Sequence, residues 1–238
     1  MQHLVEYYDE LFPVSAEQLS FYKQILARYR NPVKVLNIGC GTGSFEHKLA
    51  RLGHDVTGLE VWKELLDSAA RRRRLPMTAV RFFNMSTVEM GSFLGKKFYN
   101  IISCLNGRIV FIHDKALMRK FFCDCKMLLA EQGTLVLQLP NFSLFPGRTE
   151  ELPCLKSIRA SLGTKMERTD SETLVSQQLT TCSGKRVHLI EKAQIYPITA
   201  QEITENAQAA GFSNIAVYSG FDCGAAQKTS PFLTFEIY

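Results

Sequence analysis

Three closely spaced glycines and one acidic residue further along the chain are the residues whose types and spacing best suit chemistry. The glycines are Gly39, Gly41 and Gly43, and Glu60 follows the first of them by 21 positions (60 − 39). Glycine adopts backbone torsions that are closed to other residues and lets a ligand approach the main chain closely. A carboxylate at this distance after a glycine-rich turn is suited to bind the two hydroxyls of a ribose. We therefore expect a ligand that contains a nucleoside.

The segments around these residues predict the elements that position them. Val33, Val35, Leu36 and Ile38 form a short apolar, partly β-branched run that stops at Gly39, as expected for a parallel strand buried on both faces. Helical spacing resumes at Phe45 and Leu49, and Gly53 is suited to end that helix. Residues 55–60 then predict a second strand whose last residue is the carboxylate. The order is strand, glycine turn, helix and strand.

The spacing of the glycines argues against two common nucleotide motifs. In the dinucleotide pattern GxGxxG the third glycine would stand at position 44, which is Ser44 here, because Gly43 comes one residue early. A P-loop is excluded because no Gly-Lys-Ser/Thr follows.

The string Asn37-Ile38-Gly39-Cys40-Gly41-Thr42-Gly43, together with Glu60, resembles the class I S-adenosylmethionine-dependent methyltransferases of small-molecule type. The resemblance covers nearly the whole chain apart from a segment after the fifth predicted strand. It implies S-adenosyl-L-methionine as the cofactor and S-adenosyl-L-homocysteine as the product. The glycine loop would pass the methionine part of the cofactor, and Glu60 and its neighbour Val61 would lie at the ribose.

The resemblance also implies cofactor contacts after the third and fourth predicted strands. Asn84 corresponds to the family residue at the adenine amino group, and Met85 to the apolar neighbour under the ring, with Ser86 beside them. After the fourth strand the corresponding residues are Cys104, Leu105 and Asn106. The family order there is Gly-Asn, whereas this chain has Asn106 before Gly107.

Tyr8 and His113 are the candidate catalytic residues. Tyr8 belongs to an aromatic and acidic segment that resembles one folding over the cofactor in related methyltransferases, where a ring attracts a nearby sulfonium; plain packing is the alternative. His113 is a candidate base or substrate ligand, or it simply precedes a helix capped by Asp114. Methyl transfer is an in-line displacement that positioning accelerates, so a base is required only for a protonated acceptor.

The remaining pattern predicts an α/β fold, with a Rossmann-like seven-stranded, mostly parallel sheet, helices on both faces and an antiparallel last strand. We expect residues 1–238 to form one methyltransferase domain, with 1–31 as an N-terminal lid helix and 141–198 as an inserted substrate cap rich in β-structure. Extended segments at 174–181 and 186–198 predict a hairpin within this cap. Residues 146–170, with their prolines and many charges, are expected to be a mobile part of it.

Composition sets limits on the class of protein. With 238 residues and 46% apolar content, the chain is long enough for one domain with a large core. A net charge of +5 is compatible with nucleic acid but does not favour it, and the run from Arg71 to Arg74 is typical of solvated cations at a helix end. Seven cysteines without a CxxC pair indicate reduced thiols and no metal site.

Neither a signal peptide nor a run of about 20 apolar residues is present, so we expect a cytoplasmic protein that is not a membrane protein. The sequence therefore predicts a methyltransferase that acts on a small-molecule acceptor. The alternatives are an RNA or protein methyltransferase, a non-catalytic nucleoside-binding protein and an NAD-dependent oxidoreductase. The sequence sets neither the identity of the acceptor nor the oligomeric state.

Overall fold

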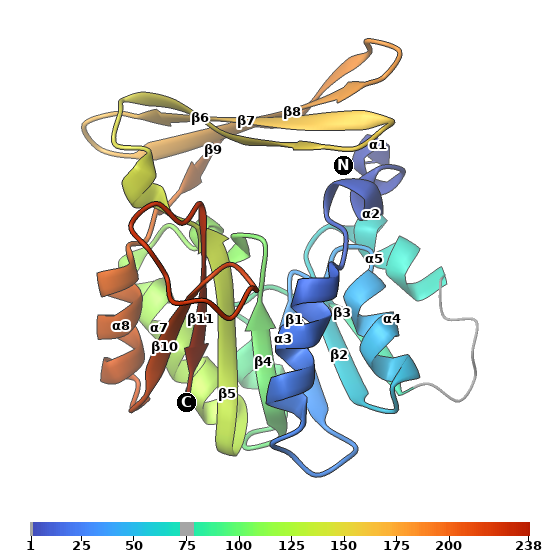
Figure 1. The fold of residues 1–238 in the computed structure, drawn as a ribbon, viewed down its shortest axis with the longest axis vertical. Coiled ribbons are helices and arrows are strands. Elements are labelled where there is room, and N and C mark those ends of the chain that lie inside the picture. Colours follow the sequence, from blue (N-terminus) through green and yellow to red (C-terminus); the bar gives the residue numbers. More distant parts are fainter. Residues whose placement is uncertain (1, 72–78) are drawn as a thin grey trace.

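A seven-stranded sheet forms the centre of the molecule in the computed structural model, which describes residues 2–71 and 79–238 (Figure 1). Its strand order is β10-β11-β5-β4-β1-β2-β3. The strands are β1 (Lys34–Ile38), β2 (Asp55–Glu60), β3 (Val80–Asn84), β4 (Tyr99–Cys104), β5 (Leu129–Pro140), β10 (Ile215–Ser219) and β11 (Phe232–Ile237). β11 runs antiparallel to both β10 and β5, and all other pairs in this sheet are parallel. This confirms the predicted Rossmann-like sheet with its antiparallel last strand.

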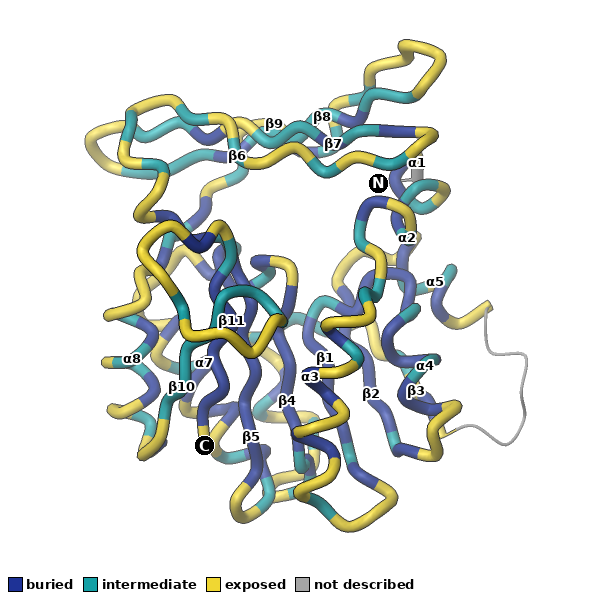
Figure 2. The backbone as a smooth tube through the Cα atoms, in the orientation of Figure 1, coloured by how far each residue is buried: buried dark blue, intermediate teal, exposed yellow. Residues whose placement is uncertain are grey.

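Helices cover both faces of this sheet. They are α3 (Ala16–Leu26), α4 (Ser44–Arg51), α5 (Lys63–Arg71), α6 (Met90–Phe93), α7 (Lys115–Leu128) and α8 (Ala200–Ala209). Side chains of β5 alternate between two buried clusters, as expected from the two-residue period of a strand. Leu135 and Leu137 belong to the cluster that includes Phe121 of α7, whereas Val136 belongs to the one that includes Tyr22 of α3. The central strands are consequently buried on both sides (Figure 2).

Three helices begin at the residues whose side chains predict caps. The Ser15 hydroxyl accepts a hydrogen bond from the Gln18 backbone N–H at 3.1 Å. The Asp114 carboxylate accepts one from Leu117 at 2.8 Å, and Thr199 forms a reciprocal capping box with Glu202 at the start of α8. Each cap satisfies a donor that the first helical turn cannot use internally.

Some element boundaries differ from those that the sequence predicts. From the sequence, Gly133 would be expected to follow the end of a helix, but β5 follows α7 without a loop and begins at Leu129, so Gly133 lies within the strand. The reason is that Leu129 pairs with Tyr99 of β4, which starts the ladder early. β3 begins at Val80, while Thr78 lies outside the described residues, as do Arg72, Arg73 and Arg74 of the arginine run.

The insertion after β5 is a separate four-stranded antiparallel sheet. Its strands are β6 (Thr149–Lys156), β7 (Ala160–Arg168), β8 (Thr173–Thr181) and β9 (Arg186–Ile195). The hairpin predicted for its second half is confirmed by the pairing of β8 with β9. The expectation of a mobile segment at 146–170 is wrong, because β7 pairs with β8 from Ala160 to Arg168 and carries β6 on its other edge. We call this four-stranded sheet the cap sheet.

The cap sheet lies across the carboxyl ends of the central strands (Figure 1). At one side it rests on the N-terminal helices α1 (Gln2–Val5) and α2 (Tyr8–Leu11), which together with α3 replace the single lid helix expected for 1–31. Leu162 and Leu179 pack there in a buried cluster with Leu11. Arg159 adds bonds to the carboxylates of Glu10 at 2.7 Å and Glu6 at 3.3 Å. Among the described residues, no helix is long and apolar enough to cross a bilayer.

Candidate active site

The glycine loop between β1 and α4 is folded tightly against the end of β2. Gly39, Gly41 and Gly43 all have positive φ angles, between +58° and +77°, a region that favours glycine. The backbone N–H groups of Gly39 and Cys40 both donate to the Leu59 carbonyl, at 2.8 and 2.9 Å. The turn therefore has a fixed conformation at the carboxyl edge of the sheet.

The Glu60 carboxylate links this loop to the segment that follows β2. Its Oε2 accepts the Gly41 N–H at 2.9 Å, and its Oε1 accepts those of Val61 and Trp62 at 2.8 and 3.0 Å. The side chain is 3% exposed. Asn84 braces the same corner by donating to the carbonyls of Glu60 and Val61. An ionised carboxylate has about four acceptor positions, so three backbone bonds leave one for a ligand hydroxyl.

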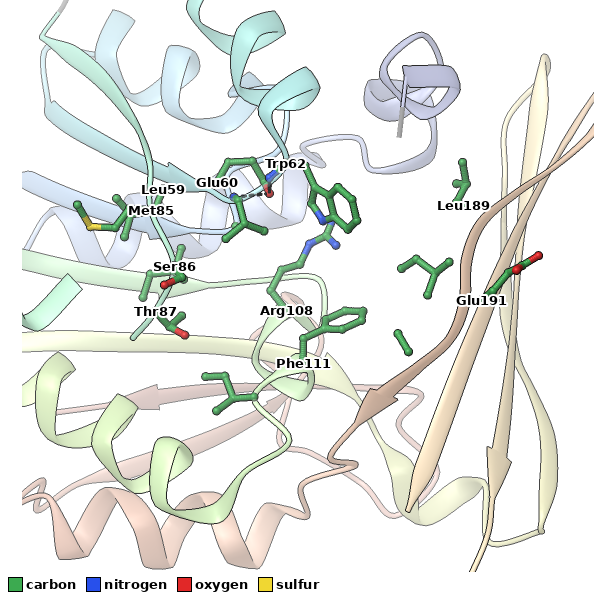
Figure 3. Close-up of a pocket in the computed structure, with 16 residues that line it drawn as sticks. Leu59, Glu60, Trp62, Met85, Ser86, Thr87, Arg108, Phe111, Leu189 and Glu191 are labelled. Atoms are coloured by element: carbon green, nitrogen blue, oxygen red, sulfur yellow. Dashed lines mark hydrogen bonds between the residues drawn. The ribbon is translucent and has the colours of Figure 1, made fainter. Parts of the chain in front are cut away.

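A cavity of about 530 Å³, here called cavity 1, opens beside this carboxylate. The lining residues that the sequence predicts are Gly39, Glu60, Val61, Met85 and Ser86. Sequence reasoning missed four others that stand out in Figure 3, namely Trp62, Thr87, Arg108 and Phe111. Leu189 of β9 faces them from the cap sheet, so the cavity is bounded by both sheets.

Two side chains cover the glycine loop between cavity 1 and the N-terminal helices. Arg108 lies on Gly39, where an added Cβ would come within 2.7 Å of its Cγ. Tyr8 lies on Gly41, where an added Cβ would come within 2.2 Å of its ring. The Arg108 guanidinium donates to the Tyr8 hydroxyl at 3.3 Å. Gly43, in contrast, packs against Phe82 of β3, where an added Cβ would come within 2.7 Å of the Phe82 ring.

Arg108 is a half-buried cation in the candidate site. Burial lowers the pKa of its guanidinium, but the neighbouring Tyr8 and Glu60 outweigh this effect, and the net direction is upward. Its Nε has no hydrogen-bond partner among the described residues. Burial raises the pKa of the Tyr8 phenol, although Arg108 acts in the opposite direction. At neutral pH the site thus contains a protonated phenol and a guanidinium with an unused donor.

A second cavity of about 200 Å³, cavity 2, adjoins the first at Phe111, which lines both. Side chains from four places in the chain surround it: Phe12 after α2, Asn106 after β4, Gln138 of β5 and Gln177 of the cap sheet. Cavity 2 is therefore closed partly by the N-terminal segment and partly by the insertion.

A buried polar pair lies under the glycine loop. The Asn37 amide donates to Oε1 of Glu46 at 2.5 Å, and both side chains are at most 5% exposed. Asn37 Oδ1 and Glu46 Oε2 have no partner among the described residues. Burial raises the pKa of Glu46 to about 7, although the Asn37 bond acts in the opposite direction. A proton on Oε2 would supply the donor that Asn37 Oδ1 lacks.

The structure gives most other predicted cofactor residues a supporting position. Thr42 donates to the Asp9 carboxylate at 2.5 Å, and the Cys40 sulfur lies against Gly58. Cys104 and Leu105 are buried. None of these residues lines cavity 1, and the same holds for Asn37, Gly41, Gly43 and Asn84. Asn106 lines cavity 2.

The two candidate catalytic residues have different positions. Tyr8 is buried beside the glycine loop. His113 is exposed directly before the Asp114 cap and lines neither cavity. A signal for Arg108 was present in the sequence, since it follows Asn106 by two positions in the loop after β4, at the edge where α/β sheets bind ligands.

Comparisons with known proteins agree with this geometry. Residues 35–133 match a family model described as a methyltransferase domain. A protein of Geobacillus sp. (strain WCH70) named as a methyltransferase is 25% identical over 138 residues, which are 56% of this chain and 54% of that protein. The ubiquinone biosynthesis O-methyltransferase of Photobacterium profundum is 36% identical over 72 residues, 30% of each chain. The match thus spans about half of one curated relative and about a third of the other.

Solved structures share the fold over nearly the whole chain. A S-adenosylmethionine-dependent methyltransferase from Clostridium acetobutylicum has a TM-score of 0.79 at 14% identity, covering 99% of this chain and 97% of that one. CalS10, an amino pentose methyltransferase from Micromonospora echinaspora solved with S-adenosylmethionine bound, has a TM-score of 0.66 at 19% identity, covering 93% and 92%. Residues 35–133 thus match a methyltransferase domain, and the chain as a whole has the Rossmann-like fold of solved S-adenosylmethionine-dependent methyltransferases.

Proposed function

We propose that this protein transfers the methyl group of S-adenosylmethionine to a small-molecule acceptor. The observation that carries the proposal is the arrangement around Glu60. Its carboxylate is anchored to the glycine loop, retains one acceptor position and lines a cavity of about 530 Å³ that continues towards a second one. That volume lies within the range of about 300–1,000 Å³ typical of small-molecule sites.

The residues around cavity 1 fit the parts of this cofactor. Glu60 would accept a ribose hydroxyl, and Met85 and Val61 offer apolar surface for an adenine ring. Arg108 would bind the carboxylate of the methionine part, because its buried Nε is an unused donor and guanidinium–carboxylate bonds are strong. Tyr8, on Gly41, would enclose the same part from the side of the N-terminal helices.

When bound, the cofactor supplies an electrophilic methyl group on a sulfonium. The task of the chain is then to orient an acceptor against it and to exclude water. Cavity 2 supports this role, since it lies beyond Arg108 and Phe111 from the ribose end and is closed by the cap sheet. We therefore assign the acceptor to cavity 2 and the role of a substrate cap to residues 141–198.

The size of cavity 2 favours a small acceptor over a macromolecule. At about 200 Å³ it is smaller than a usual drug-sized site, and its walls come from several separate parts of the chain. Two structural neighbours are described as sugar or amino-sugar methyltransferases, which supports an acceptor of this scale. An RNA or protein substrate would have to insert a single side chain or base into it.

Calorimetric titration tests the proposal. Wild-type protein should bind S-adenosylmethionine and S-adenosylhomocysteine and should not bind NADH. In a second step, the protein with methyl-labelled cofactor is incubated with pools of small metabolites, with total tRNA and with a protein extract. Label in the metabolite pools supports the proposal. Binding of NADH alone, or label in RNA or protein only, would contradict it.

A further inference from the structure

The side-chain amide of Gln138 has an orientation that the structure fixes. The Asn106 backbone N–H lies 2.7 Å from Gln138 Oε1. A backbone N–H can only donate, so the atom that meets it must be the amide oxygen and not the nitrogen. The Nε2 group consequently lies on the other side of the amide, with two donor hydrogens.

Gln138 presents this donor to cavity 2. The residue is 8% exposed and belongs to the lining of the cavity. Among residues 2–71 and 79–238, the one bond of this side chain is the one that its Oε1 accepts, and no acceptor is found for its Nε2. A donor on a largely buried side chain that has no protein partner is available to a ligand or water in the cavity. Gln138 therefore indicates that the occupant of cavity 2 carries a hydrogen-bond acceptor.

The rest of the lining is uncharged. The other polar side chains are Asn106, Thr164 and Gln177, of which Gln177 already donates to Thr164 at 3.2 Å. None of the described residues that line cavity 2 is acidic, basic, a histidine, a tyrosine or a cysteine. A charged group would lose its hydration there without a compensating partner. The part of the acceptor that enters must be uncharged and largely apolar.

The same lining restricts the atom that is methylated. A hydroxyl acceptor must lose its proton as it attacks, and no described residue around cavity 2 can take that proton. The titratable groups of neighbouring cavity 1 do not replace it. Arg108 is a donor only, Glu60 is held by three backbone N–H groups, and the side chain of Glu191 is turned away from the cavity (Figure 3). Tyr8 remains protonated beside Arg108.

We propose that cavity 2 binds a small, uncharged amine that also carries an oxygen atom, and that Gln138 Nε2 donates a hydrogen bond to that oxygen. This inference rests on the proposed function. The lone pair of the neutral nitrogen forms the new N–C bond while the methyl C–S bond breaks, and the electron pair of that bond stays on sulfur as a thioether. The positive charge passes to the nitrogen, and the ammonium product then releases a proton to water.

Four matched aromatic probes test the inference by binding. 3-Aminoacetophenone has both the amine and an oxygen that only accepts hydrogen bonds. Aniline lacks the oxygen, 3-aminobenzoate carries a negative charge, and 3-hydroxyacetophenone replaces the amine by a hydroxyl. Dissociation constants are measured by ligand-observed NMR on the full-length protein saturated with S-adenosylhomocysteine. We expect 3-aminoacetophenone to bind about tenfold more tightly than aniline, the effect of one hydrogen bond, and 3-aminobenzoate to bind more weakly than both.

Substitution of Gln138 tests whether this side chain causes the preference for 3-aminoacetophenone over aniline. In Gln138→Met the tenfold preference for 3-aminoacetophenone over aniline should fall below about threefold, while aniline binding reports that the cavity is intact. Gln178→Met is the matched control, because that glutamine contacts His188 and does not line the cavity. A preference that survives in Gln138→Met would overturn the assignment.

Methyl uptake from labelled S-adenosylmethionine gives an independent readout. Label should enter 3-aminoacetophenone and not 3-hydroxyacetophenone. Three outcomes would overturn the inference: equal labelling of 3-hydroxyacetophenone, tight binding of 3-aminobenzoate, or no label in 3-aminoacetophenone or aniline. If S-adenosylmethionine itself does not bind in the calorimeter, the proposed function fails; if it binds and the neutral amine is not preferred, only this inference fails.

Discussion

Replacing Glu46 by glutamine is expected to stabilise the protein above neutral pH and to change its stability much less near pH 5. Glu46 is fully buried and faces Asn37, and the two atoms without partners, Asn37 Oδ1 and Glu46 Oε2, are the pair that a proton would join. In Glu46→Gln an amide N–H takes the place of that proton. The substitution therefore keeps the acceptor of the Asn37 amide, supplies a donor for Asn37 Oδ1 at every pH and removes the charge.

The expected size follows from the pKa. Burial raises the pKa of Glu46 from its ordinary 4.5 to about 7. The folded protein consequently holds this proton more tightly than the unfolded chain does, so the contribution of Glu46 to stability is greatest below pH 4.5 and falls as the pH rises through about 7. One pKa unit corresponds to about 1.4 kcal/mol, so an ionised Glu46 costs about 3 kcal/mol above pH 7. The neutral amide of the Glu46→Gln variant avoids this cost.

Chemical denaturation of both proteins at pH 5, 6, 7 and 8 measures the effect. The free energy of unfolding of Glu46→Gln should exceed that of the wild type by an amount that grows by about 2 kcal/mol or more between pH 5 and pH 8. Glu131→Gln, at an exposed position, is the control and should show a difference that does not change with pH. A pH-independent difference for Glu46→Gln would refute the protonated pair under the glycine loop.

Three further substitutions test the cofactor site. Glu60→Gln removes the charged acceptor of the Gly41 N–H and should weaken S-adenosylmethionine binding by about 1–3 kcal/mol; an unchanged dissociation constant by calorimetry would contradict the ribose assignment. Gly41→Val combines a φ of +58° with a contact of 2.2 Å between the added Cβ and Tyr8. It should therefore lower the unfolding free energy by more than the roughly 1–2 kcal/mol of backbone strain expected for Gly184→Ala, which has open space around it. Equal losses in denaturant titrations would show that the Tyr8 side chain can move aside at no cost. Arg108→Met should weaken S-adenosylmethionine by about tenfold or more and adenosine much less, because only the former has a carboxylate; equal losses for the two ligands would place Arg108 elsewhere.

Local sequence patterns were sufficient for the elements that carry the cofactor loop. The run that ends at Gly39, the stop at Gly53 and the caps at Ser15 and Asp114 each depend on neighbouring residues only, and the corresponding elements are present. The first two strands of the cap sheet lacked such a signal. Most of β6 is exposed or half-buried, and its pairing with β7 shifts in register between Leu152 and Leu155, so no alternating pattern marks it as a strand.

Site residues that belong to a local sequence motif were predicted. Site residues that reach the cavities only through the folding of distant segments were missed. Glu60 is the last residue of β2, Met85 and Ser86 directly follow β3, and all three line cavity 1. Arg108 enters the site only because a tight turn after β4, with both Asn106 and Gly107 at positive φ, directs the next residues back over Gly39. Gln138 acquires its role from a hydrogen bond to a residue 32 positions away, which no local pattern encodes.

The insertion leaves and rejoins the central sheet at neighbouring points. Asn141 and Phe142, where it starts, border the same small pocket as Ile198 and Thr199, where it ends. A segment whose two ends meet can be exchanged for another of different length without moving the strands on either side of it. A chimera carrying a foreign segment in place of 141–198 should therefore keep the glycine loop and Glu60 in position while changing the walls that Leu189 and Gln177 give to the two cavities.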